Sequence, residues 1–497
     1  MNYATVRNFQ NIPLATIPLV TYDEFLETNI TFINDPANHC VNYFGISAGE
    51  RIKLFCCIAN DTYQVIYLSS CMVTDAKVLS SFSATHICYE KFERELHENF
   101  GIPYSDHPWL KPVRYAYDRA DASMLLANYP FYSIDSEELH EVGVGPIHAG
   151  IIEPGHFRFL CNGEQILHLE IQLGYSHRGI EPLFLSKRKL LQRMVLSESI
   201  AGDSVVAHAT TFAVVWEALC AFQPDPELDF VRTLALELER IAIHTGDLSA
   251  VCTDIAYQLG SSVFGRLRTP IINFMQQWCG NRLSKGLIRP GQNNYYFTRQ
   301  LAEELTRILD VFEPDFLEMC RELFHLPSTL ARFEKTGMVT FAQATSIGTV
   351  GMAARMLGIS RDIRFSHPSF LYAQLHHSPV IKHHGDVFSR VQIRKEEIKQ
   401  SIGYVRQLLQ HLPAKSVMPA LQRPSADSFV IGMVEGWRGE ICHCAITDTQ
   451  GELICYKVKD PSFHNWLALA LSVRNNEISD FPISNKSFDL SYCGHDL

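Results

Sequence analysis

The sequence predicts an α+β fold in which an N-terminal α/β domain precedes a mainly helical large domain with small β elements. Apolar runs at Ile52–Ile58 and Tyr63–Leu68 flank the turn signal Asn60-Asp61, a pattern typical of paired strands. From about residue 183 to residue 412, apolar side chains recur at helical spacing. Three further strand candidates then follow, at 429–434, 441–447 and 453–458.

The first domain is predicted to end near residue 125. A charged helix over about Tyr89–Phe100 stops at Gly101, because glycine readily adopts the left-handed conformation at a helix C-terminus. Residues 126–145 are rich in turn formers and predict a linker, which leaves 146–497 as the large domain. That domain opens on a predicted hairpin, in which His156–Cys161 and Gln165–Leu173 alternate in polarity.

Later helices are predicted at 228–244, 297–324, 384–412 and 463–473, followed by an extended tail from Ser484 to Leu497. The segment 238–248 places Glu239, Arg240, His244 and Asp247 on a helix that also has an apolar stripe. Because isolated buried charges are costly, we expect these charges to be paired.

Composition excludes several classes of function. The chain has 497 residues and a formal net charge of -11, so it has no basic surplus with which to bind nucleic acid. No run of 18 apolar residues predicts a transmembrane helix, and the N-terminus carries no secretory signal. We therefore expect a cytoplasmic chain that reaches a membrane only through partner subunits.

The 14 cysteines do not form metal-binding pairs. Nowhere does the sequence contain CxxC, the spacing by which one turn supplies two thiolates to an ion or cluster. Most cysteines stand in apolar company, as in the run Leu54–Ile58. We expect reduced, buried thiols that act as small hydrophobic groups.

Two ordered motifs near the end of the first domain resemble the 30 kDa subunit of respiratory complex I. They are the acidic helix with its Phe-Gly-Ile end, at 92–102, and the sequence His107-Pro108-Trp109-Leu110. The resemblance implies that this stretch is a docking element without a catalytic role.

Motifs of the large domain resemble the complex I 49 kDa subunit and, more closely, the large subunits of formate hydrogenlyase-type (group 4) nickel-iron hydrogenases. The quoted stretches are 145–148, 155–158, 174–181, 238–248, 280–291, 351–364, 385–390, 435–440 and 460–463. The resemblance implies a fused 30 kDa–49 kDa subunit in the peripheral arm of a complex-I-related oxidoreductase, on the cytoplasmic side of the inner (cell) membrane. It further implies three kinds of partner: a small iron-sulfur (20 kDa-like) subunit, a ferredoxin-like two-cluster subunit and antiporter-like membrane subunits. Iron-sulfur clusters are then expected in the partners, and no cofactor in this chain.

The ligands of a nickel-iron centre are missing from the matched positions. In the resembled hydrogenases, four thiolates from two CxxC turns hold the metals, but the segment Ser197–His208 contains no cysteine. The second pair corresponds to Ser491 and Gly494, and Cys493 stands alone and out of register. Serine cannot replace a thiolate here because its pKa is far too high. The chain therefore resembles hydrogenase-related members of the family that lack the nickel site.

The resemblance implies that the remaining site residues line a vacated cavity near the C-terminal tail. Glu198 and Arg438 are the candidate proton-relay groups, and His148, His156 and His177 are candidates for binding a quinone or another substrate. We expect Arg438 to pair with an acidic residue of the wall. The alternative is that each histidine is structural and that Arg438 is an exposed turn residue after Gly436.

Three functions remain open. The first is a metal-free large subunit that couples an iron-sulfur electron donor to ion-translocating membrane subunits. The second is a quinone-reducing, NADH dehydrogenase-like subunit that uses the vacated cavity, and the third is an active hydrogenase. Direct NAD binding is not expected, because no GxGxxG follows a predicted strand.

Overall fold

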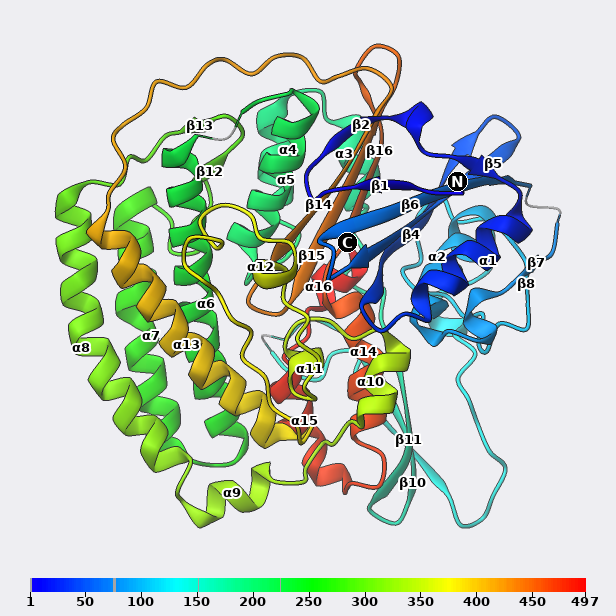
Figure 1. Ribbon diagram of the computed structural model, residues 1–497. Coiled ribbons are helices and arrows are strands. Elements are labelled where there is room, and N and C mark those ends of the chain that lie inside the picture. Colours follow the sequence, from blue (N-terminus) through cyan, green and yellow to red (C-terminus); the bar gives the residue numbers. More distant parts are fainter. Residues whose placement is uncertain (1, 75–76, 151, 224) are drawn as a thin grey trace.

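The computed structural model describes residues 2–74, 77–150, 152–223 and 225–497. Figure 1 shows an N-terminal sheet with its helices on one side, a central C-terminal sheet, and a layer of long helices on the other side. Helices and sheets both contribute to the cores, so the predicted α+β class is confirmed. Within the described residues, no helix combines the length and the hydrophobicity needed to cross a lipid bilayer.

The N-terminal sheet has the strand order β1-β6-β5-β4, with β3 beside β6. All its pairs are antiparallel except β3–β6, so it is not an alternating parallel α/β sheet. The predicted hairpin and helix are confirmed as β5–β6 and α2, and α2 ends at Gly101 with φ 73°. The elements are β1 (Ala4–Val6), β3 (Leu19–Val20), α1 (Tyr22–Ile33), β4 (Asn38–Ala48), β5 (Arg51–Asn60), β6 (Val65–Val73), β7 (Leu79–Ser80), α2 (Glu90–Phe100) and β8 (Tyr104–Ser105).

The first 125 residues share a core with the C-terminal sheet. Strand β2 (Asn11–Pro13) pairs antiparallel with β14 (Ser428–Glu435) and completes the order β16-β15-β14-β2, with β15 at Glu440–Thr447 and β16 at Leu453–Lys459. Between the two sheets, the ring of Phe55 lies 5.5 Å from that of Phe44 and 6.0 Å from that of Phe429. These apolar side chains face each other in one cluster, so the two sheets bury each other's inner faces.

The hairpin after the first domain is confirmed, but the linker before it is partly a strand. β10 (His156–Asn162) pairs with β11 (Gln165–Gln172), and β9 (His140–Val144) adds to the other edge of β10. Part of the predicted linker 126–145 is therefore sheet. The many turn-forming residues in 126–145 favoured the prediction of a linker over that of a strand at His140–Val144. This short strand forms because it pairs with β10.

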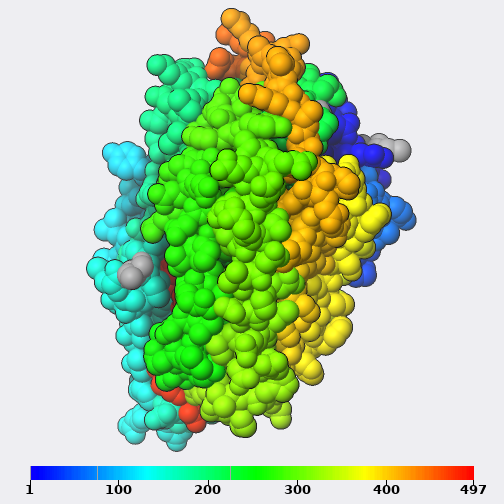
Figure 2. All heavy atoms as spheres, turned by 90° about the vertical axis from the view of Figure 1, so that its left-hand side faces the viewer, coloured from blue at the N-terminus to red at the C-terminus, as the bar shows by residue number. Residues whose placement is uncertain are grey.

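The long helices form the opposite layer and contain the largest apolar core. Helix α6 lies at its centre, packs against α7 and α13, and begins at the N-cap Asp225 with Pro226 in its first turn. Figure 2 views this layer from outside. Its elements are α3 (Ile180–Ser186), α4 (Leu190–Ser197), α5 (Val205–Leu219), α6 (Pro226–Asp254), α7 (Gln258–Cys279), β12 (Ile288–Arg289), β13 (Gln292–Asn293), α8 (Arg299–Leu323), α9 (Pro327–Phe333) and α13 (Val387–Gln410).

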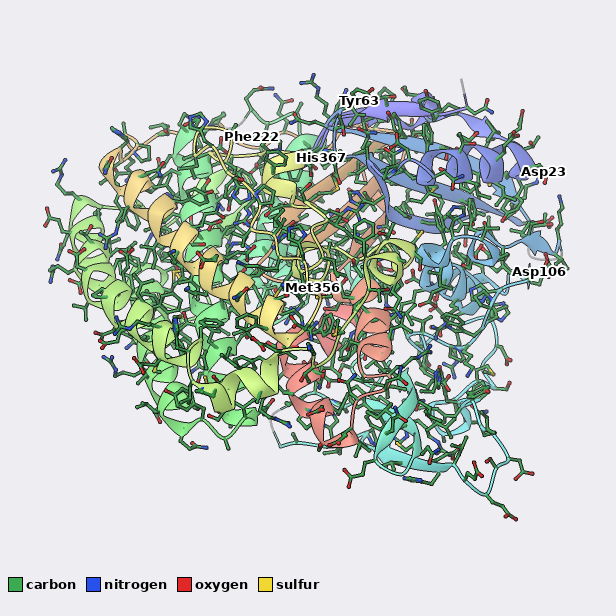
Figure 3. All side chains as sticks on the ribbon, turned by 60° about the horizontal axis from the view of Figure 1, so that its bottom comes forward. Asp23, Tyr63, Asp106, Phe222, Met356 and His367 are labelled. Atoms are coloured by element: carbon green, nitrogen blue, oxygen red, sulfur yellow. The ribbon has the colours of Figure 1, made fainter. Side chains whose placement is uncertain are left out.

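Short helices connect the layers. In Figure 3, Met356 lies in the interior, whereas Asp23, Tyr63 and Asp106 lie at the edge of the N-terminal unit. The prediction of an extended tail after Ser484 was wrong, because most of that segment is helical and buried. The helices are α10 (Phe341–Ile347), α11 (Met352–Arg355), α12 (Ile363–Ser366), α14 (Ser462–Ser472), α15 (Phe481–Phe488) and α16 (Tyr492–Asp496).

Of the charges predicted on α6, Arg240, His244 and Asp247 have ionisable partners inside the protein, whereas, among the described residues, the carboxylate of Glu239 accepts only from the backbone N–H groups of Val206 and Ala207. The carboxylate of Glu397 on α13 accepts from Arg355 at 2.6 Å and from His244 at 2.7 Å. Arg364 and Arg240 lie 3.4 and 3.7 Å from the same carboxylate. All five side chains are fully buried or nearly so, which makes Glu397 the shared counter-ion of three guanidinium groups.

All 14 cysteines are buried and free. Native protein should therefore react with less than about one equivalent of a thiol reagent such as dithionitrobenzoate within minutes, because burial keeps these thiols away from the reagent. In denaturant, all 14 thiols should react. Rapid modification of several cysteines in the native state would contradict this prediction.

Candidate functional site

Helix α16 at the C-terminus lies against the turn after β11. The carboxylate of Asp496 accepts from the backbone N–H groups of Gly174, at 2.9 Å, and Ser176, at 2.8 Å. His177 bonds through Nδ1 to the carbonyl oxygen of Asp496 at 2.7 Å. Burial raises the pKa of Asp496 to about 7, although the two N–H donors oppose that shift. The last residues of the chain are thus fixed to the hairpin.

Arg178 holds together the two segments in which the resemblance locates metal ligands. Its guanidinium donates to the carbonyl oxygens of Ser199, at 2.6 Å, and Ile200, at 2.8 Å. The same group donates to the carbonyl oxygen of Cys493 at 3.2 Å. The segment at 197–208 and the tail at 491–494 therefore meet.

Arg438 lies in the turn between β14 and β15 and is only 2% exposed. It donates to both carboxylate oxygens of Asp203, at 2.6 and 3.3 Å, and to the carbonyl oxygen of Asp489 at 2.6 Å. Burial acts to lower the pKa of Arg438, but Asp203 more than offsets this and the net shift is upward. Arg438 is thus paired with a carboxylate, as expected, and is not an exposed turn residue.

A chain of buried titratable groups lies beside this ion pair. The Oδ2 atom of Asp460 is 3.1 Å from Nε2 of His208, whose Nδ1 is 3.1 Å from Nε2 of His443. The hydroxyl of Tyr456 is 2.9 Å from Nδ1 of His443. His208 and Arg438 hold the pKa of Asp460 at about 2 against the opposing effect of burial, so Asp460 is ionised.

The donor set at the tail does not fit a nickel-iron centre. Ser491 caps α16 by accepting from the N–H of Gly494 at 2.9 Å. A Cβ atom on Gly494 would lie 2.7 Å from the carboxylate of Asp460, so Asp460 fills the space that a side chain there would need. Burial raises the pKa of the Cys493 thiol to about 12, which leaves it protonated. Among the residues that the structure describes, no three His, Cys, Asp or Glu side chains converge in a way that could hold a metal ion.

The other predicted site residues divide into two groups. His148 lies near the tail, with Nε2 at 3.4 Å from the hydroxyl of Tyr492. His156 packs instead on the ring of Phe131, with 5.2 Å between the ring centroids. Glu198 does not pair with Arg438 but accepts from Arg289 at 2.6 Å and from the N–H of Gly286 at 2.9 Å.

Side chains of the protein itself pack around α16, where the vacated cavity was expected. Beside Gly202 and Asp203, the structure leaves a pocket of only about 20 Å³, which is too small for a quinone ring. The side chains of Asp460, Tyr492 and Arg438 occupy the space around α16. In this chain alone, the site is a packed polar junction.

Sequence reasoning missed the side chains that build this junction. Arg178 and Asp460 stand inside motifs that carry the resemblance, Asp203 lies in the matched segment Ser197–His208, and Asp496 is the penultimate residue of the printed sequence. The motifs signalled that these positions matter. Each of them also has a partner more than 200 residues away, so only the folded structure reveals which groups meet.

Comparison with known proteins shows that the chain is similar to hydrogenases and to subunits of NADH-quinone oxidoreductases. Residues 259–428 match the family model of the 49 kDa subunit of the respiratory-chain NADH dehydrogenase. The chain is 25% identical over 390 residues to hydrogenase-4 component G of Escherichia coli, covering 78% of this chain and 67% of that protein. It is 26% identical over 351 residues to a carbon monoxide-induced hydrogenase of Rhodospirillum rubrum, covering 70% and 97%. It is also 28% identical over 360 residues to an NADH-quinone oxidoreductase subunit from Dehalococcoides mccartyi, covering 70% and 96%.

Proposed function

This chain belongs to the family that unites the complex I 49 kDa subunit with group 4 hydrogenase large subunits, and from that premise we propose that it is a large subunit without a nickel-iron centre. In this proposal, it occupies the peripheral arm of a complex-I-related membrane oxidoreductase. It couples electron transfer from an iron-sulfur partner to ion-translocating membrane subunits, and residues 1–125 serve as a fused 30 kDa-like docking domain.

The packing at α16 carries the proposal. Ser491 is used as a helix cap, Gly494 has no room for a side chain, and the Cys493 thiol is protonated. A nickel-iron pair needs several thiolates that converge on the metals, and these groups cannot supply them. Arg178 and Arg438 supply the connections between segments in this chain instead.

The relatives support a role within a larger assembly. Their names describe a component of hydrogenase-4 and one subunit of an NADH-quinone oxidoreductase. We propose the same dependence here, with a small iron-sulfur subunit, a two-cluster ferredoxin-like subunit and antiporter-like membrane subunits as partners. The chain would then be a peripheral protein on the cytoplasmic side of the membrane.

Arg438 acts in this proposal as a positioning residue. A guanidinium stays protonated in proteins, so it cannot pass a proton on, and Glu198 is occupied by Arg289. The chain Asp460–His208–His443–Tyr456 is better suited to relay protons, because each member lies within hydrogen-bond distance of the next. In the proposal, Arg438 holds the turn between β14 and β15 in place beside this chain through its bonds to Asp203 and Asp489.

Metal analysis of the purified complex tests the proposal. We expect less than about 0.1 nickel per chain, because protonated or absent thiols cannot hold the ion. Iron and acid-labile sulfide should co-purify with the iron-sulfur partners. A group 4 hydrogenase purified in parallel provides the positive control. About one nickel per chain, or a chain that co-purifies with no iron-sulfur subunit, would refute the proposal.

The quinone-reducing alternative is favoured by the similarity to the NADH-quinone oxidoreductase of Dehalococcoides mccartyi. The packed junction means that such a cavity would have to form between this chain and a partner. Quinone-dependent turnover of the whole complex would distinguish the two functions. Turnover that ceases in a His148→Ala variant, but not in a variant of the distant His325, would support the alternative.

A further inference from the structure

A large cavity lies between the N-terminal unit and the hairpin, outside the junction at α16. Its volume is about 1000 Å³, at the upper end of the roughly 300–1,000 Å³ that small-molecule sites occupy. Helix α2, the loop at 108–113, the strands β10 and β11, and helix α14 surround it. Much of the wall is aliphatic, with Ile87, Leu110, Leu169, Ile347, Leu467 and Leu471 as examples.

The carboxylates in the wall are already paired. Glu90 accepts from Arg94 at 3.0 Å, and Glu170 forms an ion pair with Lys111. An additional cation from a ligand would therefore find its counter-charges occupied.

Two cations of the wall, in contrast, have no carboxylate within salt-bridge distance in the described part of the chain. The amine of Lys91 donates to the carbonyl oxygen of Phe463 at 2.8 Å, which uses one of its three donors. Burial lowers the pKa of Lys91 to about 7, as expected for an amine without a counter-ion. The guanidinium of Arg474, which is exposed, lies 3.2 Å from Nδ1 of His168. The cavity thus combines apolar walls with two basic side chains that have no carboxylate partner among the described residues.

We propose that this cavity binds a single-chain amphiphile, whose anionic head group pairs with Lys91 and whose hydrocarbon chain packs against the aliphatic wall. A hydrocarbon chain gains free energy by leaving water for this surface. An anionic head supplies the counter-charge that Lys91 lacks, and Arg474 offers a second contact. A carboxylate and a phosphate monoester share this chemistry.

The site is separate from the proposed redox role. It borders the junction through His495 of α16 and through Trp466, whose indole N–H donates to the carbonyl oxygen of Ser491. The proposed ligand contacts, Lys91 and Arg474, are not among the residues that carry the subunit proposal. Failure of the subunit proposal would therefore leave this one intact, and the reverse also holds.

Fluorescence titration of the purified full-length chain tests the proposal, with dansylaminoundecanoic acid as the probe. Oleate and oleoyl lysophosphatidate should both displace the probe, and the tighter of the two identifies the head group. Oleyl alcohol, which has the same chain without the charge, should bind at least about tenfold more weakly. Equal displacement by the alcohol, or no probe binding, would overturn the proposal.

Variants locate the head group. Lys91→Met should weaken oleate binding at least about tenfold, and Lys91→Arg should retain most of it. Lys399→Met removes an exposed lysine on α13 and should change nothing. If Lys91→Met fails to fold, Arg474→Met provides a second test, and we expect it to weaken oleate binding about threefold or more.

If one folded variant binds oleate as tightly as the unmodified protein, the substituted residue does not contact the head group. If both variants do so, the proposal is overturned.

Discussion

Replacing Glu397 by glutamine should lower the free energy of unfolding by about 3–5 kcal/mol, because the loss of a buried counter-ion leaves its partners uncompensated. Arg355, Arg364 and Arg240 all lie within 3.7 Å of this one carboxylate. Burial lowers the pKa of the fourth partner, His244, to about 4, so this imidazole is neutral and acts as a hydrogen-bond donor. Denaturant unfolding, followed by circular dichroism, measures the effect.

The neighbouring residue provides a matched control. Glu396 has the same chemistry and stands on the same helix, but its side chain is 31% exposed and pairs with the exposed Lys399. Glu396→Gln should change the free energy of unfolding by no more than about 0.5 kcal/mol. Equal effects of the two substitutions would show that the cluster around Glu397 is not held together by its charge.

A methyl group on Gly494 should also destabilise the protein, by about 1–3 kcal/mol, through overpacking against Asp460. The new Cβ would lie 2.7 Å from the carboxylate of Asp460, which His208 and the N–H of Ser462 hold in place. Helix propensity alone predicts the opposite sign, because alanine is favoured over glycine in a helix. Thermal unfolding of Gly494→Ala therefore separates the two effects.

Gly403 on α13 is the corresponding control. Nothing lies within 4 Å of a Cβ atom added there. Gly403→Ala should therefore raise stability by about 0.5–1 kcal/mol. The contact with Asp460 also predicts that Ser491→Cys combined with Gly494→Cys destabilises the tail and does not recreate a metal site. A stabilised Gly494→Ala protein would contradict the close packing.

Periodicity and turn residues were sufficient to predict the elements that depend on local sequence. The helix ending at Gly101, the hairpin β10–β11 and the strands β14 to β16 all have strong local patterns. The helices α15 and α16 could not be recognised in this way, because they have eight and five residues and show no clear apolar period. They form because packing on α13 and α14 stabilises them.

The site was predictable only in part, for a similar reason. The motifs marked Arg438 and the tail as parts of one region, and an acidic partner for Arg438 followed from the cost of a buried charge. Nothing in the sequence identified Asp203 as the partner of Arg438, or Arg289 as the partner of Glu198. Those choices depend on the packing of α4, α5 and the loop at 286–289.

The strand β2 determines when the polypeptide can complete its fold. Asn11–Pro13 pairs with Ser428–Val430, so this strand can pair only after more than 400 further residues have been synthesised. Such a late contact has a high entropic cost of loop closure and favours slow folding. During that delay, the apolar face that carries Phe55 lacks its cover and is open to aggregation. The late pairing of β2 therefore exposes the nascent chain to the kind of aggregation that chaperones prevent.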